Sequence, residues 1–294
     1  MYKNNTPCFN MTKAIFSAQA PKTLILVLLV LMQYYCKAQS TPLPNGFAHN
    51  DYRHKRPLFD ALENGFTNIE ADIFLRDTTL VVAHALPQFK SKGRNLERLY
   101  LKPLHDRVLA NNGRVYAGYV RPVILMIDIK TGSDDTYRAL ARILDKYRDM
   151  LTSYNNGDVH YGAITVVLSG HKPYKMLEGQ TSRVAFIDED LRKVARDSSA
   201  VNNDVFTMAS CKYSRMLSWD GKGPMPLLQR ERLLRFVGMA HRLGTKVRLW
   251  ASPDRQVVWD ELLKCGVDLI NTDHLVTLKN YLAKSQVTLA KADL

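Results

Sequence analysis

The feature that most constrains the fold is an alternation of short apolar runs with helical segments from residue 46 onward. Apolar runs of about four to eight residues are typical of buried strands, and strands that alternate with helices form parallel sheets. The expected strands are 46–48, 68–75, 123–130, 163–168, 183–187, 205–209, 245–250 and 267–270, with 80–83 as a hairpin partner or continuation of the second. The expected helices are 56–65, 94–112, 134–151, 227–243 and 256–264, with a short helix at the end of the chain.

Eight such units predict an α/β protein with a single (β/α)8 TIM barrel, a fold that typically takes about 250 residues. The alternative is an open, doubly wound sheet, but no glycine-rich phosphate-binding turn follows the first expected strand. In a barrel, Cys211 would end the sixth strand, whereas Cys265 would precede the eighth strand at the opposite rim. We therefore expect both cysteines to be unpaired.

Residues 1–38 differ in composition from the rest and predict a secretory signal peptide. Lysines without any acidic residue precede the apolar run 23–32, and Ala38 offers a small residue for cleavage. That run is about half as long as the roughly 20 residues that span a bilayer. We expect cleavage near Ala38, export to the periplasm or the extracellular space, and a mature domain of residues 39–294. An uncleaved anchor is the alternative; a lipoprotein is disfavoured because tyrosines precede Cys36.

The formal net charge of the chain is +13, and it falls to +9 once the four lysines of the leader are removed. A basic surface favours anionic partners such as phosphate esters, anionic lipid surfaces or nucleic acid. Charge alone does not choose among these partners, because the basic residues are scattered and only 53–56 form a dense cluster.

Polar side chains gather at the ends of the first three expected barrel strands, the rim where such barrels carry their chemistry. Glu70 and Asp72 are two positions apart in one strand and therefore face the same way. Asp128 and Lys130 repeat this spacing in the next barrel strand. Three neighbouring carboxylates repel one another unless a cation lies between them, and oxygen ligands suit Mg²⁺ or Ca²⁺ better than Zn²⁺. The pattern predicts a site for one divalent cation.

The same strand ends supply His49, Asn50 and His84 as candidates for proton transfer and ligation. A single histidine or acid at a strand end is more often structural than functional, but their combination in neighbouring strands favours a site. Trp250, at the end of a later strand, is a candidate to stack on a substrate headgroup, with plain packing as the alternative. The acids at 188–190 are interpreted as a solvated loop rather than a second metal site.

The chain resembles the phospholipase C-like phosphodiesterase superfamily in HNDY (49–52), PLFDAL (57–62), GFTNIEADIFL (65–75) and LVVAH (80–84). Within that superfamily the similarity is greatest to the altered-inheritance-of-mitochondria branch, which shares the His-Asn-Asp-Tyr opening and the Glu-Ala-Asp strand. The chain is also similar to glycerophosphodiester phosphodiesterases, including their ending, here GVDLINTDHLVTLKNYL (266–282). The resemblance spans nearly the whole mature chain, and it is strongest over 46–84.

This resemblance implies a metal-dependent phosphodiesterase that cleaves a glycerophosphodiester or a phospholipid headgroup. The implied ligands of one Mg²⁺ or Ca²⁺ ion are Glu70, Asp72 and Asp128, with Asn50 as a fourth. The implied general acid–base pair is His49 and His84, and the implied substrate contacts are Lys130 to phosphate and Trp250 to the headgroup. We expect a monomer that acts on a small-molecule or lipid phosphodiester. Contact with a membrane surface is left open, and nucleic acid is not expected.

Three departures distinguish the chain from glycerophosphodiester phosphodiesterases. Asn50 stands where they usually have Arg, Ala85 where they have Asp, and Asp128 where they have Glu. One alternative is therefore a secreted, non-catalytic barrel that binds an anionic, phosphate-containing ligand. A metal-dependent glycosidase is another, but it would need two carboxylates flanking a sugar and would give the histidines no necessary role.

Overall fold

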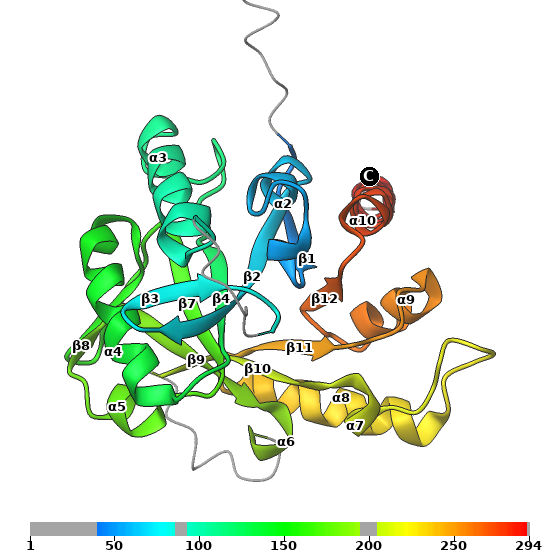
Figure 1. Cartoon of the computed structure of the whole chain (residues 1–294). Coiled ribbons are helices and arrows are strands. Elements are labelled where there is room, and N and C mark those ends of the chain that lie inside the picture. The colour runs from blue at the N-terminus through cyan, green and yellow to red at the C-terminus, as the bar shows by residue number, and fades with distance from the viewer. Residues whose placement is uncertain (1–39, 86–92, 195–204, 293–294) are drawn as a thin grey trace, which may run out of the picture. The chain divides into compact units, whose positions relative to one another are not determined.

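Eight parallel strands close into a barrel in the computed structural model, which describes residues 40–85, 93–194 and 205–292 (Figure 1). The strands are β1 (Leu43–Ala48), β2 (Phe66–Arg76), β4 (Val123–Ile129), β7 (Ile164–Gly170), β9 (Ala185–Asp190), β10 (Phe206–Lys212), β11 (Lys246–Trp250) and β12 (Leu269–Thr272). Strand β1 pairs in parallel with both β2 and β12, so the sheet has no open end. The predicted barrel is confirmed, and the open sheet is excluded. The predicted leader lies outside the described residues.

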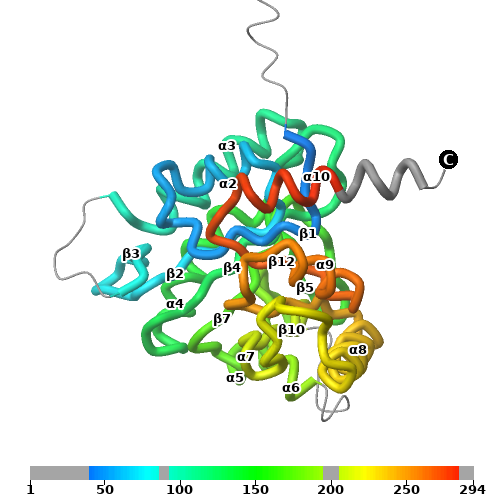
Figure 2. The backbone as a smooth tube through the Cα atoms, turned by 90° about the vertical axis from the view of Figure 1, so that its right-hand side faces the viewer, coloured from blue at the N-terminus to red at the C-terminus, as the bar shows by residue number. Residues whose placement is uncertain are grey.

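Helices surround the barrel, and α10 packs beside β1 (Figures 1 and 2). The longer segments are α3 (Lys102–Ala110), α4 (Ser133–Leu144), α8 (Leu227–Arg242), α9 (Gln256–Lys264) and α10 (Leu275–Ala292). The shorter ones are η1 (Asp51–Arg53), α2 (Phe59–Glu63), η2 (Glu97–Leu101), η3 (Asp145–Met150), α5 (Tyr174–Glu178), α6 (Leu191–Val194) and α7 (Tyr213–Met216). None of the helices in the described ranges is long and apolar enough to cross a membrane.

Two antiparallel elements lie outside the eight-stranded barrel. β3 (Thr79–Val82) pairs with β2, so the run at 80–83 is a hairpin partner rather than a continuation. A small sheet of β5 (Ser153–Asn155), β6 (Asp158–His160) and β8 (Ser182–Arg183) was not predicted. Asn156 and Gly157, both with positive φ, connect β5 to β6 in the left-handed conformation that two-residue hairpin turns require.

The strands bury apolar side chains on both faces, which is why they read as continuous hydrophobic runs. Side chains that face the helices form one large cluster, to which Ile69, Ala71 and Ile73 of β2 belong. A smaller, separate cluster fills the barrel interior: Phe47, Ile124, Met126, Val167, Met208 and Leu269. Because side chains alternate along a strand, Glu70 and Asp72 face the interior as well.

Strand register brings the acids of β2 and β4 together. Asp72 pairs directly with Asp128, and Glu70 pairs with Met126 of the interior cluster. The carboxylates therefore lie next to one another towards the C-terminal ends of the two strands, as the spacing predicted.

Both cysteines of the described domain are free and buried, which confirms that Cys211 and Cys265 are unpaired. Burial raises the pKa of the Cys211 thiol to about 12. At neutral pH this thiol is protonated, so it is a poor nucleophile although it borders the cavity described below.

Candidate functional site

A cavity of about 570 Å³ opens at the C-terminal ends of the barrel strands. The predicted site residues that line it are His49, Asn50, Glu70, His84, Asp128, Lys130 and Trp250. Asp72 is buried directly behind this lining and hydrogen-bonds to Lys130. The fold thus brings together side chains from the C-terminal ends of β1, β2, β4 and β11 and from the segment after β3. The sequence predicted this grouping at the rim of the barrel.

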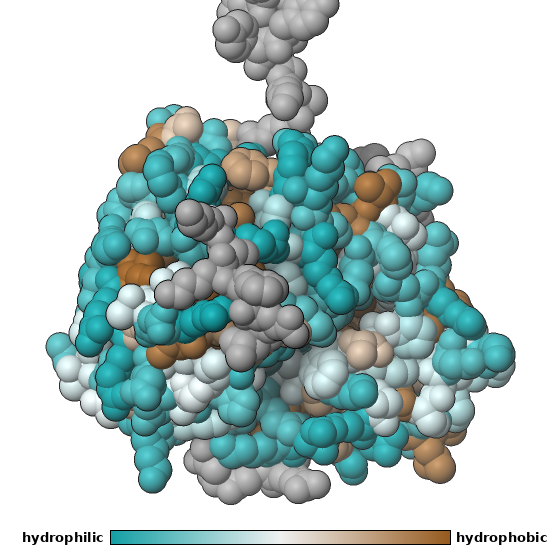
Figure 3. All heavy atoms as spheres, in the orientation of Figure 1, coloured by the Kyte–Doolittle hydropathy of each residue, from teal (hydrophilic) through white to brown (hydrophobic). Residues whose placement is uncertain are grey.

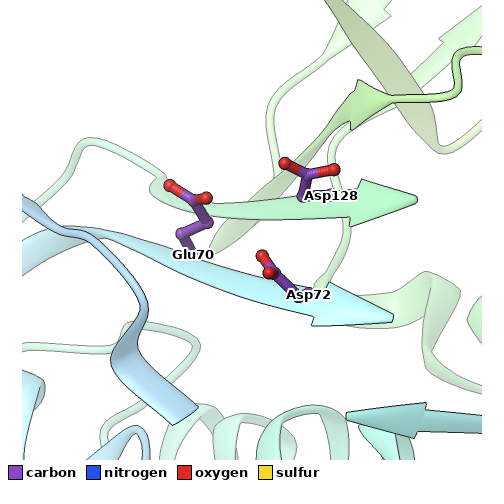
Figure 4. Close-up of side chains that lie close together, drawn as sticks. All are labelled: Glu70, Asp72 and Asp128. Carbon is purple, nitrogen blue, oxygen red and sulfur yellow. The ribbon is translucent and has the colours of Figure 1, made fainter. Parts of the chain in front are cut away.

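The three predicted metal ligands converge on a single point. One oxygen from each of Glu70, Asp72 and Asp128 lies within 4.8 Å of the others, and Figure 4 shows the carboxylates turned towards one another. The Oδ1 atoms of Asp72 and Asp128 are buried without a hydrogen-bond partner among the described residues. Burial raises the pKa of both Glu70 and Asp128. Buried carboxylate oxygens that lack donors fit a hard divalent cation such as Mg²⁺ or Ca²⁺.

Lys130 supplies a cation beside this cluster. Its Nζ lies 3.0 Å from Asp72 Oδ2 and 3.1 Å from Asp128 Oδ2. Burial alone would lower the pKa of Lys130, but the two carboxylates outweigh that effect and raise it. The ammonium is therefore charged at neutral pH, and it borders the cavity.

His49 is oriented by an acid from the last strand end. Its Nδ1 lies 2.8 Å from Asp273 Oδ1, and this hydrogen bond lowers the pKa of Asp273. A carboxylate this close accepts a hydrogen bond from Nδ1–H, which leaves Nε2 as the nitrogen that can exchange a proton with a ligand. The amide nitrogen of Asn50 approaches the same pair, 3.2 Å from Asp273 Oδ1.

Tyr52, the last residue of the HNDY motif, is a site residue whose role the sequence did not predict. Its hydroxyl lies 2.6 Å from Asn50 Oδ1, 2.8 Å from Asp72 Oδ2 and 3.0 Å from His84 Nδ1. Burial, reinforced by the Asp72 carboxylate, raises the pKa of Tyr52, so the phenol stays protonated. The Tyr52 hydroxyl therefore contacts Asn50, Asp72 and His84 at the same time. Its only sequence signal is its place three residues after His49.

Arg248 of β11 was also missed. It is buried, and its Nη2 lies 2.6 Å from Glu70 Oε2 across the barrel. Its Nε donates to Asn271 Oδ1 at 2.8 Å, and its guanidinium lies 3.9 Å from the ring centroid of Phe47. Arg248 therefore fixes one oxygen of Glu70. An arginine between the apolar residues Val247 and Leu249 of the strand was the signal that could have revealed it.

The interpretation of 188–190 as a solvated loop is wrong. These acids form the end of β9, and Asp188 and Glu189 are buried. Glu189 accepts hydrogen bonds from Tyr174 at 2.9 Å and Lys193 at 2.7 Å, and Arg192 pairs with Asp190. The strand extends beyond its apolar run because these partners compensate the buried charges. The apolar run alone gives no indication of these partners.

Gly170, at the end of β7, borders the carboxylate cluster. Its φ is +70°, and a Cβ at this position would lie 2.1 Å from Asp128 Oδ1 and 2.4 Å from the Ile129 carbonyl oxygen. We expect Gly170→Ala to lower the free energy of unfolding by about 1–3 kcal/mol, the typical scale of backbone strain, and to displace Asp128. Urea denaturation and cation titration would measure the two effects.

Gly132→Ala is the matched control for this substitution. Gly132 has a negative φ, and a Cβ there would meet no atom within 4 Å. Its effect on unfolding should stay within about 0.5 kcal/mol. Equal stability of the two variants would contradict the packing described at Gly170.

Known proteins show similarity over most of the chain. A family model for the AIM6-like phosphodiesterase domain matches residues 37–188, and one for the glycerophosphoryl diester phosphodiesterase family matches 246–275. Altered inheritance of mitochondria protein 6 from Eremothecium gossypii is 30% identical, with 80% of this chain and 68% of that protein covered. The Lachancea thermotolerans protein of the same name is 28% identical, with 79% and 64% covered. This chain thus spans about two thirds of the length of these relatives.

A solved structure shares the fold. The crystal structure of a glycerophosphodiester phosphodiesterase from Parabacteroides distasonis is 14% identical, and the match covers 84% of this chain and all of that one. Its TM-score of 0.50 concerns the architecture alone. The family model and the E. gossypii relative carry the assignment further, and the chain belongs to the family of AIM6-like phosphodiesterase domains.

Proposed function

We propose that the chain is a divalent-cation-dependent phosphodiesterase acting on a glycerophosphodiester or a phospholipid headgroup. The observation that carries this proposal is the convergence of Glu70, Asp72 and Asp128 in a cavity also lined by two histidines and a lysine. Membership of a phosphodiesterase-domain family agrees with it.

The cation site would use the three carboxylates and the amide oxygen of Asn50. That oxygen and Asp72 Oδ2 contact the same Tyr52 hydroxyl, at 2.6 and 2.8 Å, so the amide faces the cluster. A bound Mg²⁺ or Ca²⁺ would offset the negative charge that a phosphodiester develops as it is attacked. Lys130 would contact a non-bridging phosphate oxygen from the same side.

His49 and His84 would move the protons. One imidazole takes the proton from the attacking O–H as the new O–P bond forms, and the other protonates the leaving alkoxide as its P–O bond breaks. Asp273 holds His49 in the tautomer that leaves Nε2 for this transfer. Either water or a substrate hydroxyl next to the phosphate can supply the attacking O–H. Phosphorus NMR of the products, open or cyclic, would distinguish the two nucleophiles.

A turnover assay tests the proposed function directly. The purified mature domain would be incubated with bis(p-nitrophenyl) phosphate and with glycerophosphodiesters, in EDTA and after addition of Mg²⁺ or Ca²⁺. We expect cleavage that EDTA abolishes and one of the two cations restores. Ligand binding without cleavage under all these conditions would instead favour the non-catalytic barrel.

Cation binding should also raise stability independently of turnover. A cation at 100 times its dissociation constant adds about 2.7 kcal/mol to the free energy of unfolding. We expect Mg²⁺ or Ca²⁺ to raise Tm, EDTA to reverse the rise, and Asp72→Asn to remove it. Asp190→Asn is the control, because Asp190 borders the same cavity but pairs with Arg192. A Tm response retained in Asp72→Asn would place the cation elsewhere.

We also propose that the domain is exported as a monomer after cleavage near Ala38. The mass of the mature protein in the periplasmic or culture fraction would test the cleavage point, and sedimentation would test the monomer. On the face seen in Figure 3 the described residues are mainly hydrophilic, with hydrophobic ones in small separate groups.

A further inference from the structure

The cavity extends beyond the carboxylate cluster to a second wall. This cationic wall consists of Lys172, which follows β7, Lys212, the last residue of β10, and Arg215 of α7. The proposed cation, the histidines and Lys130 occupy the side formed by β1, β2 and β4. The cationic wall therefore has no role in the chemistry proposed above.

Two cations of this wall lack an acidic partner. In the ranges that the structure describes, neither Lys212 nor Arg215 forms an ion pair with a carboxylate. Lys212 instead places its Nζ 5.7 Å from the ring centroid of Trp250, and Lys172 donates to the Asp188 carbonyl oxygen at 2.7 Å. The charges of Lys212 and Arg215 are therefore available to a ligand.

The charge of the lining argues for a second anion as well. Five cationic side chains and four carboxylates border the cavity, and Asp72 behind the lining makes five carboxylates. A divalent cation would add two more positive charges. Two acids do face the cationic wall, but Arg192 neutralises Asp190, and Lys172 and Arg248 offset Asp188. One phosphodiester group carries a single negative charge, so the loaded cavity would keep an excess of positive charge.

We infer that the cationic wall binds a second anionic group of the substrate, a phosphomonoester or carboxylate on the headgroup beyond the scissile phosphate. This inference rests on the proposed function for the identity of the first group. It narrows the substrate class to phosphodiesters whose headgroup is itself anionic, as opposed to choline-type or uncharged headgroups. Trp250 would lie against the part of the headgroup between the two anions.

A matched pair of substrates tests the inference. Glycerophosphoglycerol and its terminal phosphate ester differ only in the second anion, so the ratio of their kcat/KM values isolates its contribution. We expect the phosphorylated diester to be favoured at least about tenfold, the scale of one charge-assisted contact. The Lys212→Ala/Arg215→Ala variant should lose most of that preference, mainly through KM, because the contact serves binding.

Arg242→Ala/Lys264→Ala is the charge-matched control. Arg242 and Lys264 are the last residues of α8 and α9, at the opposite rim of the barrel. Removing these two charges should leave the preference intact. Vesicles of phosphatidylglycerol and of its phosphate form a second arm. A preference for the phosphorylated member in either arm supports binding of the second anion by the cationic wall. The arm that shows it, soluble diesters or vesicles, identifies whether the substrate is a free diester or a lipid.

Binding of inorganic phosphate in EDTA, measured by calorimetry, separates this inference from the proposed function. Phosphate binding that the Lys212→Ala/Arg215→Ala variant loses and the control keeps supports the wall even if no diester is cleaved. Equal cleavage of both members of the pair, or phosphate binding that the variant retains, would overturn the inference. Failure to cleave any diester would count against the proposed function alone.

Discussion

Replacing either His49 or His84 with alanine is expected to lower phosphodiester turnover by about 10²–10⁴-fold, the usual contribution of a general acid or base. Both side chains border the cavity that holds the carboxylate cluster, and neither belongs to that cluster. The Tm response to Mg²⁺ or Ca²⁺ should therefore persist in both variants while kcat falls. Stopped-time assays and thermal unfolding on the same preparations would measure both quantities.

His105→Ala provides the control for the histidine variants. His105 hydrogen-bonds to Asp149 at 2.8 Å and does not border the cavity, so its removal should leave kcat at the level of the unmodified domain. Full activity in His49→Ala or His84→Ala would refute the assignment of that imidazole to proton transfer. A joint loss of turnover and of the cation response would indicate a ligand role instead.

Arg248→Met is expected to destabilise the domain by about 3–5 kcal/mol, the cost of leaving one partner of a buried ion pair uncompensated. Arg248 and Glu70 are both almost completely buried, and they meet at 2.6 Å. Removal of the guanidinium leaves the Glu70 carboxylate in a desolvated interior whose burial already raises its pKa. Urea denaturation in EDTA would measure the loss without a compensating cation.

A double-mutant cycle isolates the pair. The Glu70→Gln/Arg248→Met variant should be more stable than the sum of the single effects predicts, because neither charge is left alone. Arg56→Met is the matched control, since Arg56 pairs with Glu63 on the exposed surface, and its effect should be far smaller. Additive single effects would show that Arg248 and Glu70 are energetically independent.

The barrel and the carboxylate cluster could be predicted because both follow from local patterns. Strand–helix alternation fixes the parallel sheet, and the i, i+2 spacing of Glu70 and Asp72 fixes their shared face. Because the C-terminal ends of all barrel strands meet at one rim, Asp128 could be placed beside them even though the strand register was not known. The small sheet was missed although Asn156-Gly157 is a hairpin signal, because its strands are too short to show a hydrophobic pattern.

The missed site residues depend on contacts between distant parts of the chain. Arg248 reaches Glu70 across 178 positions, and no local pattern specifies that partner. Tyr52 reads as a packing aromatic until the fold places Asp72 and His84 around its hydroxyl. The acids of β9 were misread for the same reason, because their cationic partners decide whether a charge can be buried.

The hydrogen bond between His49 and Asp273 links residues 224 positions apart, from the first barrel strand end and from the segment after the last. A chain synthesised from its N-terminus therefore carries its first histidine long before the acid that orients it exists. Under the proposed mechanism, the contact that orients His49 forms only when the final strand docks against the first. A truncated chain that lacks the last strand would lack this contact, so the proposed activity would depend on closure of the barrel.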